Sequence, residues 1–118
     1  MKILVVDDSA FMRSMIKRIL AEKNPEIREA SNAEEAVGAF VEFHPDLVFL
    51  DIIMPGRSGI ETLKDIRSKD PGAKVIMCTS IGGQEKVIQE CVEAGASDFI
   101  TKPFTPDEIN GVLSRFTG

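Results

Sequence analysis

The sequence predicts an α/β protein with a doubly wound parallel sheet of five strands, in the order 2-1-3-4-5, and five helices. The first observation behind this class is that a short apolar run is followed by an amphipathic segment five times along the chain. The second is that most of these runs are apolar throughout, as expected for strands that helices cover on both faces. Because strand and helix alternate strictly, right-handed crossovers should give a parallel sheet between two helical layers.

The five expected strands are the runs at residues 3–6, 27–30, 47–50, 75–78 and 99–100. The first, third and fourth runs contain only apolar residues, which is typical of the interior of a sheet. Arg28 and Glu29 interrupt the second run, and such charges suit an edge strand. With the second strand at an edge, the order 2-1-3-4-5 is the natural candidate. A sheet of that order carries its working site at the carboxyl ends of the first and third strands.

Between the expected strands, apolar residues recur at helical spacing and define one core-facing stripe for each helix. The five stripes are Phe11, Met12, Met15, Ile16, Ile19 and Leu20; Ala33, Ala36, Val37, Phe40 and Val41; Ile60, Leu63 and Ile66; Val87, Ile88, Cys91 and Val92; and Ile109, Val112, Leu113 and Phe116. Ser9 and Asn32 can cap helix starts, because their side chains accept from free backbone N–H groups. Gly95 can end the fourth helix in a left-handed turn, and Pro106 suits the first turn of the last helix.

The length of 118 residues indicates one domain over residues 1–118, and the net charge is −5 at pH 7. Apolar residues make up 43% and charged residues 28%, a balance that argues against intrinsic disorder. The acidic excess disfavours nucleic-acid binding, which needs clustered Lys and Arg. The sequence has neither an apolar run of membrane-spanning length nor a secretory signal pattern at its start, so we expect a cytoplasmic protein. Cys78 and Cys91 lie in apolar runs and are expected to be buried thiols.

Three acidic residues directly follow expected strands: Asp7 and Asp8 after the first, and Asp51 after the third. Because these strands should be neighbours, the three carboxylates should converge, and they would repel strongly unless a cation binds or a proton is shared. Carboxylate oxygens suit Mg²⁺, which leaves room for a phosphoryl oxygen. Taken singly, Asp8 or Ser9 could cap the first helix and Asp51 could open a loop, but the trio favours a magnesium site.

Two further strands end in side chains that suit the same site. The fourth is followed by Thr79, which offers a hydroxyl, and the fifth is followed closely by Lys102, which offers an ammonium group. Each of them alone fits an ordinary strand-end hydroxyl or a solvated lysine better than a functional role. Together, the carboxylates supply a nucleophile and metal ligands, Lys102 supplies a positive charge, and Thr79 supplies a hydroxyl that can donate to a phosphoryl oxygen. This combination predicts phosphoryl transfer.

The strings ILVVDDS, LVFLDIIMPGRSG, VIMCTS and DFITKPF, in this order and spacing, resemble the receiver domain of two-component response regulators over nearly the whole chain. The resemblance implies a flavodoxin-like (CheY-like) fold. It implies that Asp51 is the phosphoacceptor. It also implies that Mg²⁺ is held by Asp7, Asp8, Asp51 and the backbone carbonyl of Ile53.

The same resemblance gives roles to four residues near the ends of the fourth and fifth strands. It implies that Thr79 bonds a phosphoryl oxygen and that Lys102 pairs with the phosphoaspartate. Phe99 takes the position of the switch aromatic, where many relatives have Tyr. The bond between Lys102 and Pro103 would be cis, and X–Pro bonds are the usual site of cis peptides.

Within this family, the string DDSAFMR is most similar to stand-alone CheY-type chemotaxis regulators. Such a protein is a signalling switch that catalyses only its own phosphorylation and slow dephosphorylation. The implied partners are a chemotaxis-type histidine kinase and a motility switch or adaptor that binds within residues 84–118. We also expect a separate phosphatase and a monomeric chain. A phosphorelay intermediate and an excised receiver of a transcription factor are the alternatives within the family.

Two other classes share parts of the pattern. A flavodoxin-like FMN carrier has the same topology, but it needs a Ser/Thr/Gly-rich phosphate loop where this chain has Asp7 and Asp8, and no GxGxxG follows the first strand. A phosphatase with an aspartyl nucleophile would use the same acids, Mg²⁺, Thr and Lys. Such enzymes usually place the nucleophile after the first strand, and the short loops here leave little room for a substrate pocket.

The lifetime of a phosphoaspartate should depend on Ile53 and Ile81, which stand two positions beyond Asp51 and Thr79. In relatives that dephosphorylate quickly, these sites carry polar side chains that can orient the attacking water. Neither Ile can form such a hydrogen bond, and both add apolar bulk at the approach, so we predict slow self-dephosphorylation. The alternative is that both side chains fold back and leave the path open.

Overall fold

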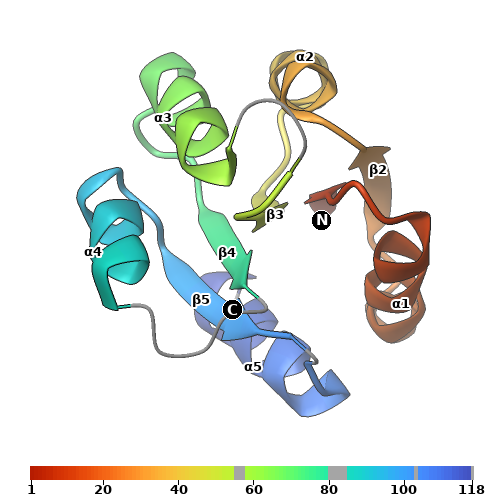
Figure 1. Cartoon of the computed structure of the whole chain (residues 1–118). Helices are drawn as coiled ribbons and strands as arrows, with labels where there is room; N and C mark the ends of the chain where they lie inside the picture. Colours follow the sequence, from red (N-terminus) through yellow and green to blue (C-terminus); the bar gives the residue numbers. More distant parts are fainter. Residues whose placement is uncertain (55–57, 80–84, 103, 118) are drawn as a thin grey trace.

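The computed structural model describes residues 1–54, 58–79, 85–102 and 104–117. Its strands are β1 (Lys2–Val6), β2 (Glu26–Ala30), β3 (Leu47–Asp51), β4 (Val75–Thr79) and β5 (Asp98–Thr101). They form a parallel sheet in the order β2-β1-β3-β4-β5, with β2 and β5 at the edges, which confirms the predicted topology (Figure 1). The third and fourth strands run one residue further than expected, so Asp51 and Thr79 are the last residues of their strands.

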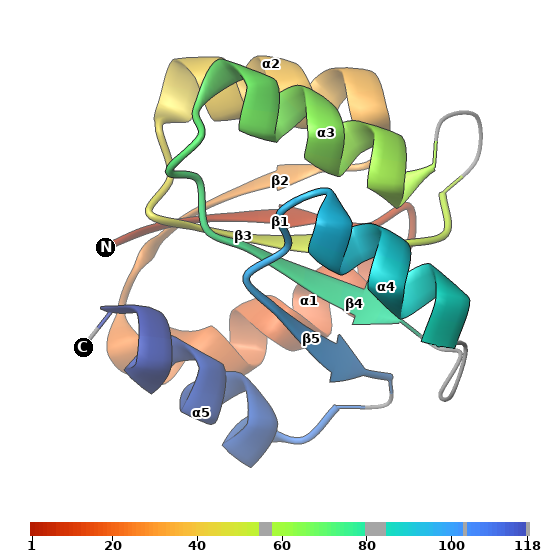
Figure 2. The same cartoon turned by 90° about the vertical axis from the view of Figure 1, so that its left-hand side faces the viewer.

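The helices are α1 (Ala10–Leu20), α2 (Ala33–Phe43), α3 (Gly59–Lys69), α4 (Glu85–Glu93) and α5 (Pro106–Thr117), and a short 3-10 turn, η1 (Ala21–Lys23), continues α1. Figure 2 shows α2, α3 and α4 over one face of the sheet and α1 and α5 over the other. This is the two-sided arrangement that strict alternation predicts. Among the described residues, no helix combines the length and the apolar character needed to cross a membrane.

The core lies in two layers, one on each face of the sheet. Successive residues of a strand point to opposite faces, so Leu4 and Val6 pack under α2, α3 and α4, whereas Ile3 and Val5 pack under α1 and α5. All residues of β3 and β4 are buried, while most of β2 is accessible, as predicted for an edge strand. Both cysteines are buried free thiols, as expected.

The predicted apolar stripes were too wide at three positions. Phe11 is 72% exposed, Val41 47% and Val92 56%, so none of them belongs to the core. Each stands at the margin of its stripe, and helical periodicity predicts an apolar face without showing how narrow a strip the sheet covers. Conversely, Phe43 is buried although no stripe included it, and the cations of Lys2 and Arg28 lie 5.4 and 4.8 Å from its ring centroid.

Side-chain caps fix where the helices next to the site begin. Ser9 accepts from the N–H of Met12 and Asn32 accepts from the N–H of Glu35, which confirms both predicted caps. Ser58 caps α3 in the same way, and this cap was not predicted from the sequence. Beyond α4, Gly95 has a φ of +97°, the left-handed conformation predicted for it.

Candidate functional site

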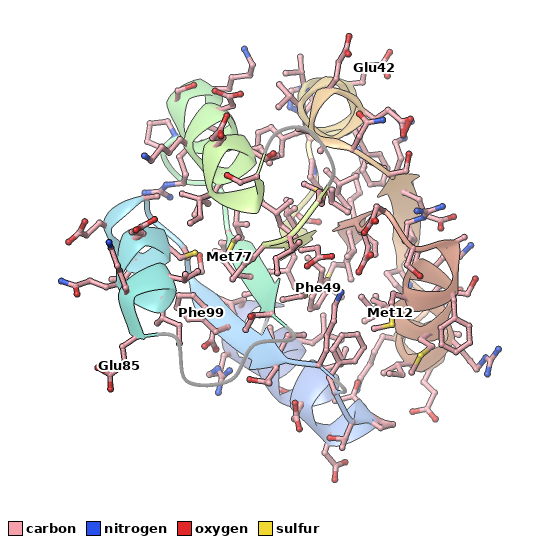
Figure 3. All side chains as sticks on the ribbon, viewed as in Figure 1. Met12, Glu42, Phe49, Met77, Glu85 and Phe99 are labelled. Carbon is pink, nitrogen blue, oxygen red and sulfur yellow. The ribbon has the colours of Figure 1, made fainter. Side chains whose placement is uncertain are left out.

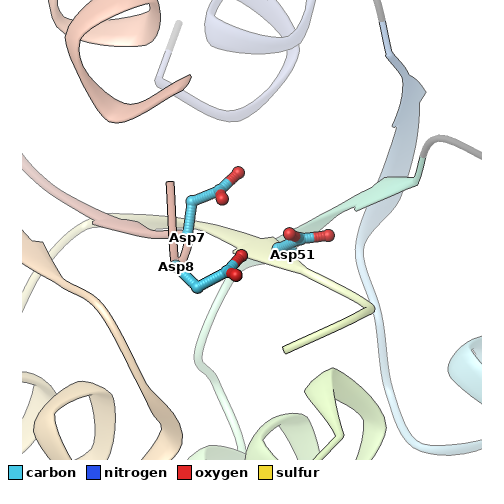
Figure 4. A group of neighbouring side chains, drawn as sticks. All are labelled: Asp7, Asp8 and Asp51. Carbon is cyan, nitrogen blue, oxygen red and sulfur yellow. The ribbon is translucent and has the colours of Figure 1, made fainter. Parts of the chain in front are cut away.

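The carboxyl ends of β1 and β3 bring three carboxylates together. Asp7 and Asp8 follow β1, Asp51 ends β3, and the two strands are adjacent in the sheet. One carboxylate oxygen of each side chain lies within 4.8 Å of the other two, and Figure 4 shows the three side chains as close neighbours. Asp7 and Asp51 are buried and Asp8 is exposed, so the cluster opens to solvent beside Asp8. The convergence predicted from the sequence is therefore confirmed.

Each polar atom of Asp7 has a hydrogen-bond partner. Its backbone N–H donates to the carbonyl of Ala30 on β2 (3.1 Å), and its own carbonyl accepts from Nη1 of Arg13 on α1 (2.5 Å). Its Oδ1 accepts from the N–H of Ser9 (2.9 Å), and its Oδ2 accepts from Nζ of Lys102 (2.7 Å). These four bonds explain how a charged residue can be only 2% exposed.

Lys102 lies beside the acidic cluster, as the sequence predicted, and its ammonium group contacts both buried carboxylates. Its Nζ is 2.7 Å from Oδ2 of Asp7 and 3.2 Å from Oδ2 of Asp51. Its backbone N–H donates to the carbonyl of Thr79 (2.7 Å), which ties the residue after β5 to the end of β4. The strand order of the sheet thus places the ammonium group of Lys102 beside the acidic cluster.

The electrostatics of this group favour a further cation. Burial raises the pKa of Asp51, and the negative charge of Asp7 adds to this effect, while Lys102 opposes it without cancelling it. Burial alone would lower the pKa of Lys102, but its hydrogen bonds and charge interactions with Asp7 and Asp51 together raise it. The ammonium therefore stays charged, and in the described part of the chain it offers one positive charge to a cluster of three carboxylates.

The donor set fits Mg²⁺. The ion prefers hard oxygen ligands and keeps several of its waters, and three carboxylate oxygens within 4.8 Å of one another, open to solvent on one side, meet both conditions. Asp7, Asp8 and Asp51 would hold it. Ile53, whose carbonyl is the fourth ligand implied by the resemblance, donates its backbone N–H to Oδ1 of Asp51 (3.2 Å). A role for that carbonyl stays a prediction.

The start of α3 closes tightly on the end of β3. The N–H of Gly59 donates to the carbonyl of Ile52 (2.8 Å). A Cβ at Gly59 would stand 2.1 Å from the carbonyl oxygen of Asp51 and 2.7 Å from Cα of Ile52. Only glycine allows this approach, so Gly59 helps to fix the backbone that carries Asp51.

Thr79 and Phe99 lie on the two neighbouring strands at the far side of the cluster. Thr79 is 6% exposed and follows Cys78, which pairs with Asp51 in the sheet register. Phe99 pairs with Met77 on β4, is partly buried, and packs against the core layer on the side of α4 (Figure 3). An aromatic side chain thus stands on the strand that leads to Lys102, as the sequence predicted.

Two predicted site residues, Ile81 and Pro103, lie outside the described residues. The gating role of Ile81 and the cis bond between Lys102 and Pro103 therefore stay predictions. Ile53, the other predicted gate residue, is 55% exposed.

Two residues that contact the site backbone, Arg13 and Gly59, were not predicted from the sequence. An arginine in the first helix ordinarily indicates a solvated side chain, and a glycine after a helix cap indicates only a turn. The available signal was position: both stand within eight residues of an acidic residue that follows a strand.

A doubly wound sheet with an acidic, lysine-paired site at its switch point is the arrangement expected of a receiver domain. The family model described as "Response regulator receiver domain" matches residues 3–114, and the chain belongs to this family. It is similar to the chemotaxis protein CheY of Thermotoga maritima, with 45% identity over 115 residues, covering 97% of this chain and 95% of the relative. The CheY of Bacillus subtilis is 49% identical over 115 residues, with the same shares covered.

A solved complex of CheX, CheY, BeF₃ and Mg²⁺ from Borrelia burgdorferi contains a similar chain. Its TM-score is 0.90 at 34% identity, covering 98% of this chain and 88% of that chain. Together these similarities identify a CheY-like receiver domain of two-component signalling. Receivers of this type are signalling proteins rather than classical enzymes, so the FMN-carrier and phosphatase alternatives lose their support.

Proposed function

We propose that this protein is a phosphorylation-activated chemotaxis switch, in which Asp51 accepts a phosphoryl group from a phosphohistidine of a chemotaxis-type histidine kinase. The observation that carries the proposal is the position of Asp51: its Oδ2 lies 3.2 Å from the ammonium of Lys102 and faces two further carboxylates. The similarity to chemotaxis relatives supports the choice of pathway. Residues 1–118 would act as one cytoplasmic domain, as a monomer.

The transfer uses the side chains that the sheet assembles. An oxygen of Asp51 attacks phosphorus, the P–O bond forms as the P–N bond to the donor imidazole breaks, and the bonding electron pair returns to that ring. When bound by Asp7, Asp8, Asp51 and the carbonyl of Ile53, Mg²⁺ offsets negative charge on the phosphoryl oxygens. Lys102 supplies a second, fixed positive charge to the same oxygens.

The switch would run through Thr79 and Phe99. A phosphoryl group on Asp51 draws the Thr79 hydroxyl inward as a donor, and Phe99 moves into the space that this leaves. The pairing of β4 with β5 and the bond from Lys102 to the Thr79 carbonyl link these movements. Because Phe lacks a hydroxyl, packing alone must stabilise the inward ring. Phosphorylation shifts the population only by its different interaction with the two states.

The output partner, a motility switch or adaptor, would bind within residues 84–118. A hollow of about 470 Å³ between β5 and α5 supports this assignment, and it is lined by Phe99, Ile100, Thr101, Asp107, Glu108, Gly111, Val112 and Arg115. An ion pair between Asp98 and Arg115 joins its two walls. The solved complex of CheX with a similar CheY supports the proposal that a separate protein docks on this chain, and we propose a phosphatase as that partner.

The test is to mix the protein with acetyl phosphate and Mg²⁺ and to locate the modification by mass spectrometry. We expect a stable, Mg²⁺-dependent mass increase on Asp51. Asp51→Asn keeps the shape and removes the nucleophile, so labelling of that variant at the original rate would show the assignment to be wrong. Rapid turnover of many phosphomonoesters would indicate a phosphatase instead. Lys102→Ala should still be labelled but should lose the response of residues 84–118.

Slow loss of the phosphoryl group is the second part of the proposal. The 55% exposure of Ile53, two residues from Asp51, supports an apolar side chain at the approach of water. An Ile53→Asn/Ile81→Glu double variant should lose its label faster than the parent protein. Equal decay rates would mean that these positions do not gate the water.

A further inference from the structure

Arg13 connects the edge strand β2 to the backbone of the acidic cluster. From the second turn of α1, its Nε lies 3.0 Å from Oε1 of Glu29 on β2, and its Nη1 donates to the carbonyl of Asp7. The side chain is only 16% exposed, so the guanidinium lies against the protein. Oε2 of the same Glu29 pairs with Lys17, which stands one turn further along α1 (3.0 Å).

The bond from Arg13 holds the peptide group that joins two of the proposed metal ligands. The Asp7 carbonyl belongs to the planar peptide between Asp7 and Asp8, so its direction fixes the orientation of that plane. The N–H on the other side of Asp7 is bonded to Ala30 at the end of β2. Both backbone groups of Asp7 are therefore tied to β2. Its N–H bonds β2 directly, and its carbonyl is linked to β2 through the Arg13–Glu29 pair.

We propose that Arg13, anchored by Glu29, is a positioning residue that sets the Mg²⁺ affinity of the cluster by holding the Asp7–Asp8 peptide in place. The inference rests on the Mg²⁺ site of the proposed function. Partners that orient metal ligands typically change metal affinity by about 10- to 100-fold. Arg13 acts through one peptide group, so we expect the lower end, about tenfold.

The direction of the effect separates positioning from simple charge. Arg13 is a cation near a cation site, so its charge alone opposes Mg²⁺, and its removal would then tighten binding. A positioning role predicts that its removal weakens binding. Lys17 provides the matched control, because Lys17→Met removes an equal charge and an ion pair from the same Glu29 while the contact from Arg13 to Asp7 stays in place.

The experiment is calorimetric titration of Mg²⁺ into the parent protein, Arg13→Met, Lys17→Met, Glu29→Gln and the Arg13→Met/Glu29→Gln double variant. Urea unfolding of each identifies folded material. We expect Arg13→Met to bind about tenfold more weakly and Lys17→Met to bind as tightly as the parent or more tightly. Glu29→Gln should weaken binding in the parent but add no further loss to Arg13→Met, since the two residues act as one unit.

Three results would overturn the inference. Arg13→Met could bind Mg²⁺ as tightly as the parent or more tightly, which would leave only a charge effect. Lys17→Met could lose as much affinity as Arg13→Met, which would indicate a general effect of α1. Absence of Mg²⁺ binding by the parent itself would remove the proposed metal site and this inference with it, whereas the first two results leave the proposed function intact.

Discussion

At the scale of single residues, Asp51 should cost the folded protein stability when no metal is bound. Its pKa is raised, chiefly by burial, so the carboxylate is less favourable in the folded state than in the unfolded chain. For such an acid, the stabilising contribution is complete below the unfolded pKa and is lost as the pH rises through the folded pKa. At pH 7 the ionised group therefore works against folding.

We expect Asp51→Asn to raise the free energy of unfolding by about 1 kcal/mol at pH 7 without Mg²⁺, a modest value because the ammonium of Lys102 offsets part of the cost of burying the charge. The gain should shrink as the pH is lowered through the folded pKa, where the parent carboxyl becomes protonated. Urea denaturation at a series of pH values measures both effects. A lower midpoint for the variant at pH 7 would contradict this account of the cluster.

Lys102 should make the opposite contribution. Its ammonium is the hydrogen-bond partner of Asp7, which is 2% exposed, so Lys102→Ala leaves a buried carboxylate without its cation. We expect a loss of about 2 kcal/mol in the absence of Mg²⁺. Mg²⁺ should then stabilise this variant more than it stabilises the parent, because it restores a positive charge to the cluster.

The control is Lys17→Ala, which breaks a more exposed ion pair with Glu29 and should cost less than about 1 kcal/mol. Thermal unfolding with and without Mg²⁺ compares the three proteins. Equal Mg²⁺ stabilisation of Lys102→Ala and the parent would show that the ammonium and the metal do not share the same carboxylates.

At the scale of elements, the contact between α3 and β3 should be the least tolerant of added volume. The Cβ of Gly59→Ala would fall 2.1 Å from the carbonyl oxygen of Asp51, and the partner atoms are backbone, which cannot rotate away. We expect α3 to be displaced and the free energy of unfolding to fall by about 3 kcal/mol. Because the displaced strand end carries Asp51, labelling by acetyl phosphate should also slow.

A glycine within another helix provides the comparison. A Cβ at Gly38 in α2 would meet no atom within 4 Å, so Gly38→Ala should stabilise the protein by about 0.5–1 kcal/mol through its helix propensity. Urea unfolding and the labelling rate of both variants test the contrast. A Gly59→Ala protein that was as stable and as reactive as the parent would mean that the contact between α3 and β3 accommodates a methyl group without cost.

The sequence predicted the elements well because their signals are local. Apolar runs place the strands, and caps such as Ser9 and Asn32 place helix starts, to within a residue or two. Prediction from the sequence failed where the burial of a side chain depends on which other elements pack around it. Phe11 has the spacing of a core residue yet is 72% exposed, because periodicity does not show how far the sheet extends under a helix.

At the scale of the whole molecule, topology explains why the site could be predicted at all. In a parallel sheet the carboxyl ends of all strands meet at one edge, so residues 7, 51 and 102 converge once the strand order is known. The bond from Arg13 to Asp7 and the approach of Gly59 to Asp51 could not be predicted in this way. They depend on side-chain length and on the spacing between helix and strand, which no periodic pattern encodes.

The same topology predicts how far activation should spread. Beryllofluoride with Mg²⁺ would mimic a phosphoryl group on Asp51, and the proposed coupling through Thr79, Lys102 and Phe99 would run along β4 and β5 toward α4 and α5. Residues at the opposite, amino ends of the strands, such as Asp46, lie outside this route. We therefore expect amide NMR shifts over residues 85–117 that are larger than those around Asp46.

The spectra of the parent and of Asp51→Asn should be recorded with and without beryllofluoride. The variant controls for binding away from the proposed phosphorylation site and should show no change beyond that caused by Mg²⁺. A Phe99→Ala variant should keep the shifts next to Asp51 and lose those in α4 and α5, because the ring that is proposed to move is absent. Shifts confined to the neighbourhood of Asp51 in the parent would mean that a group bound at Asp51 does not affect residues 85–117. That result would refute the proposed coupling through β5.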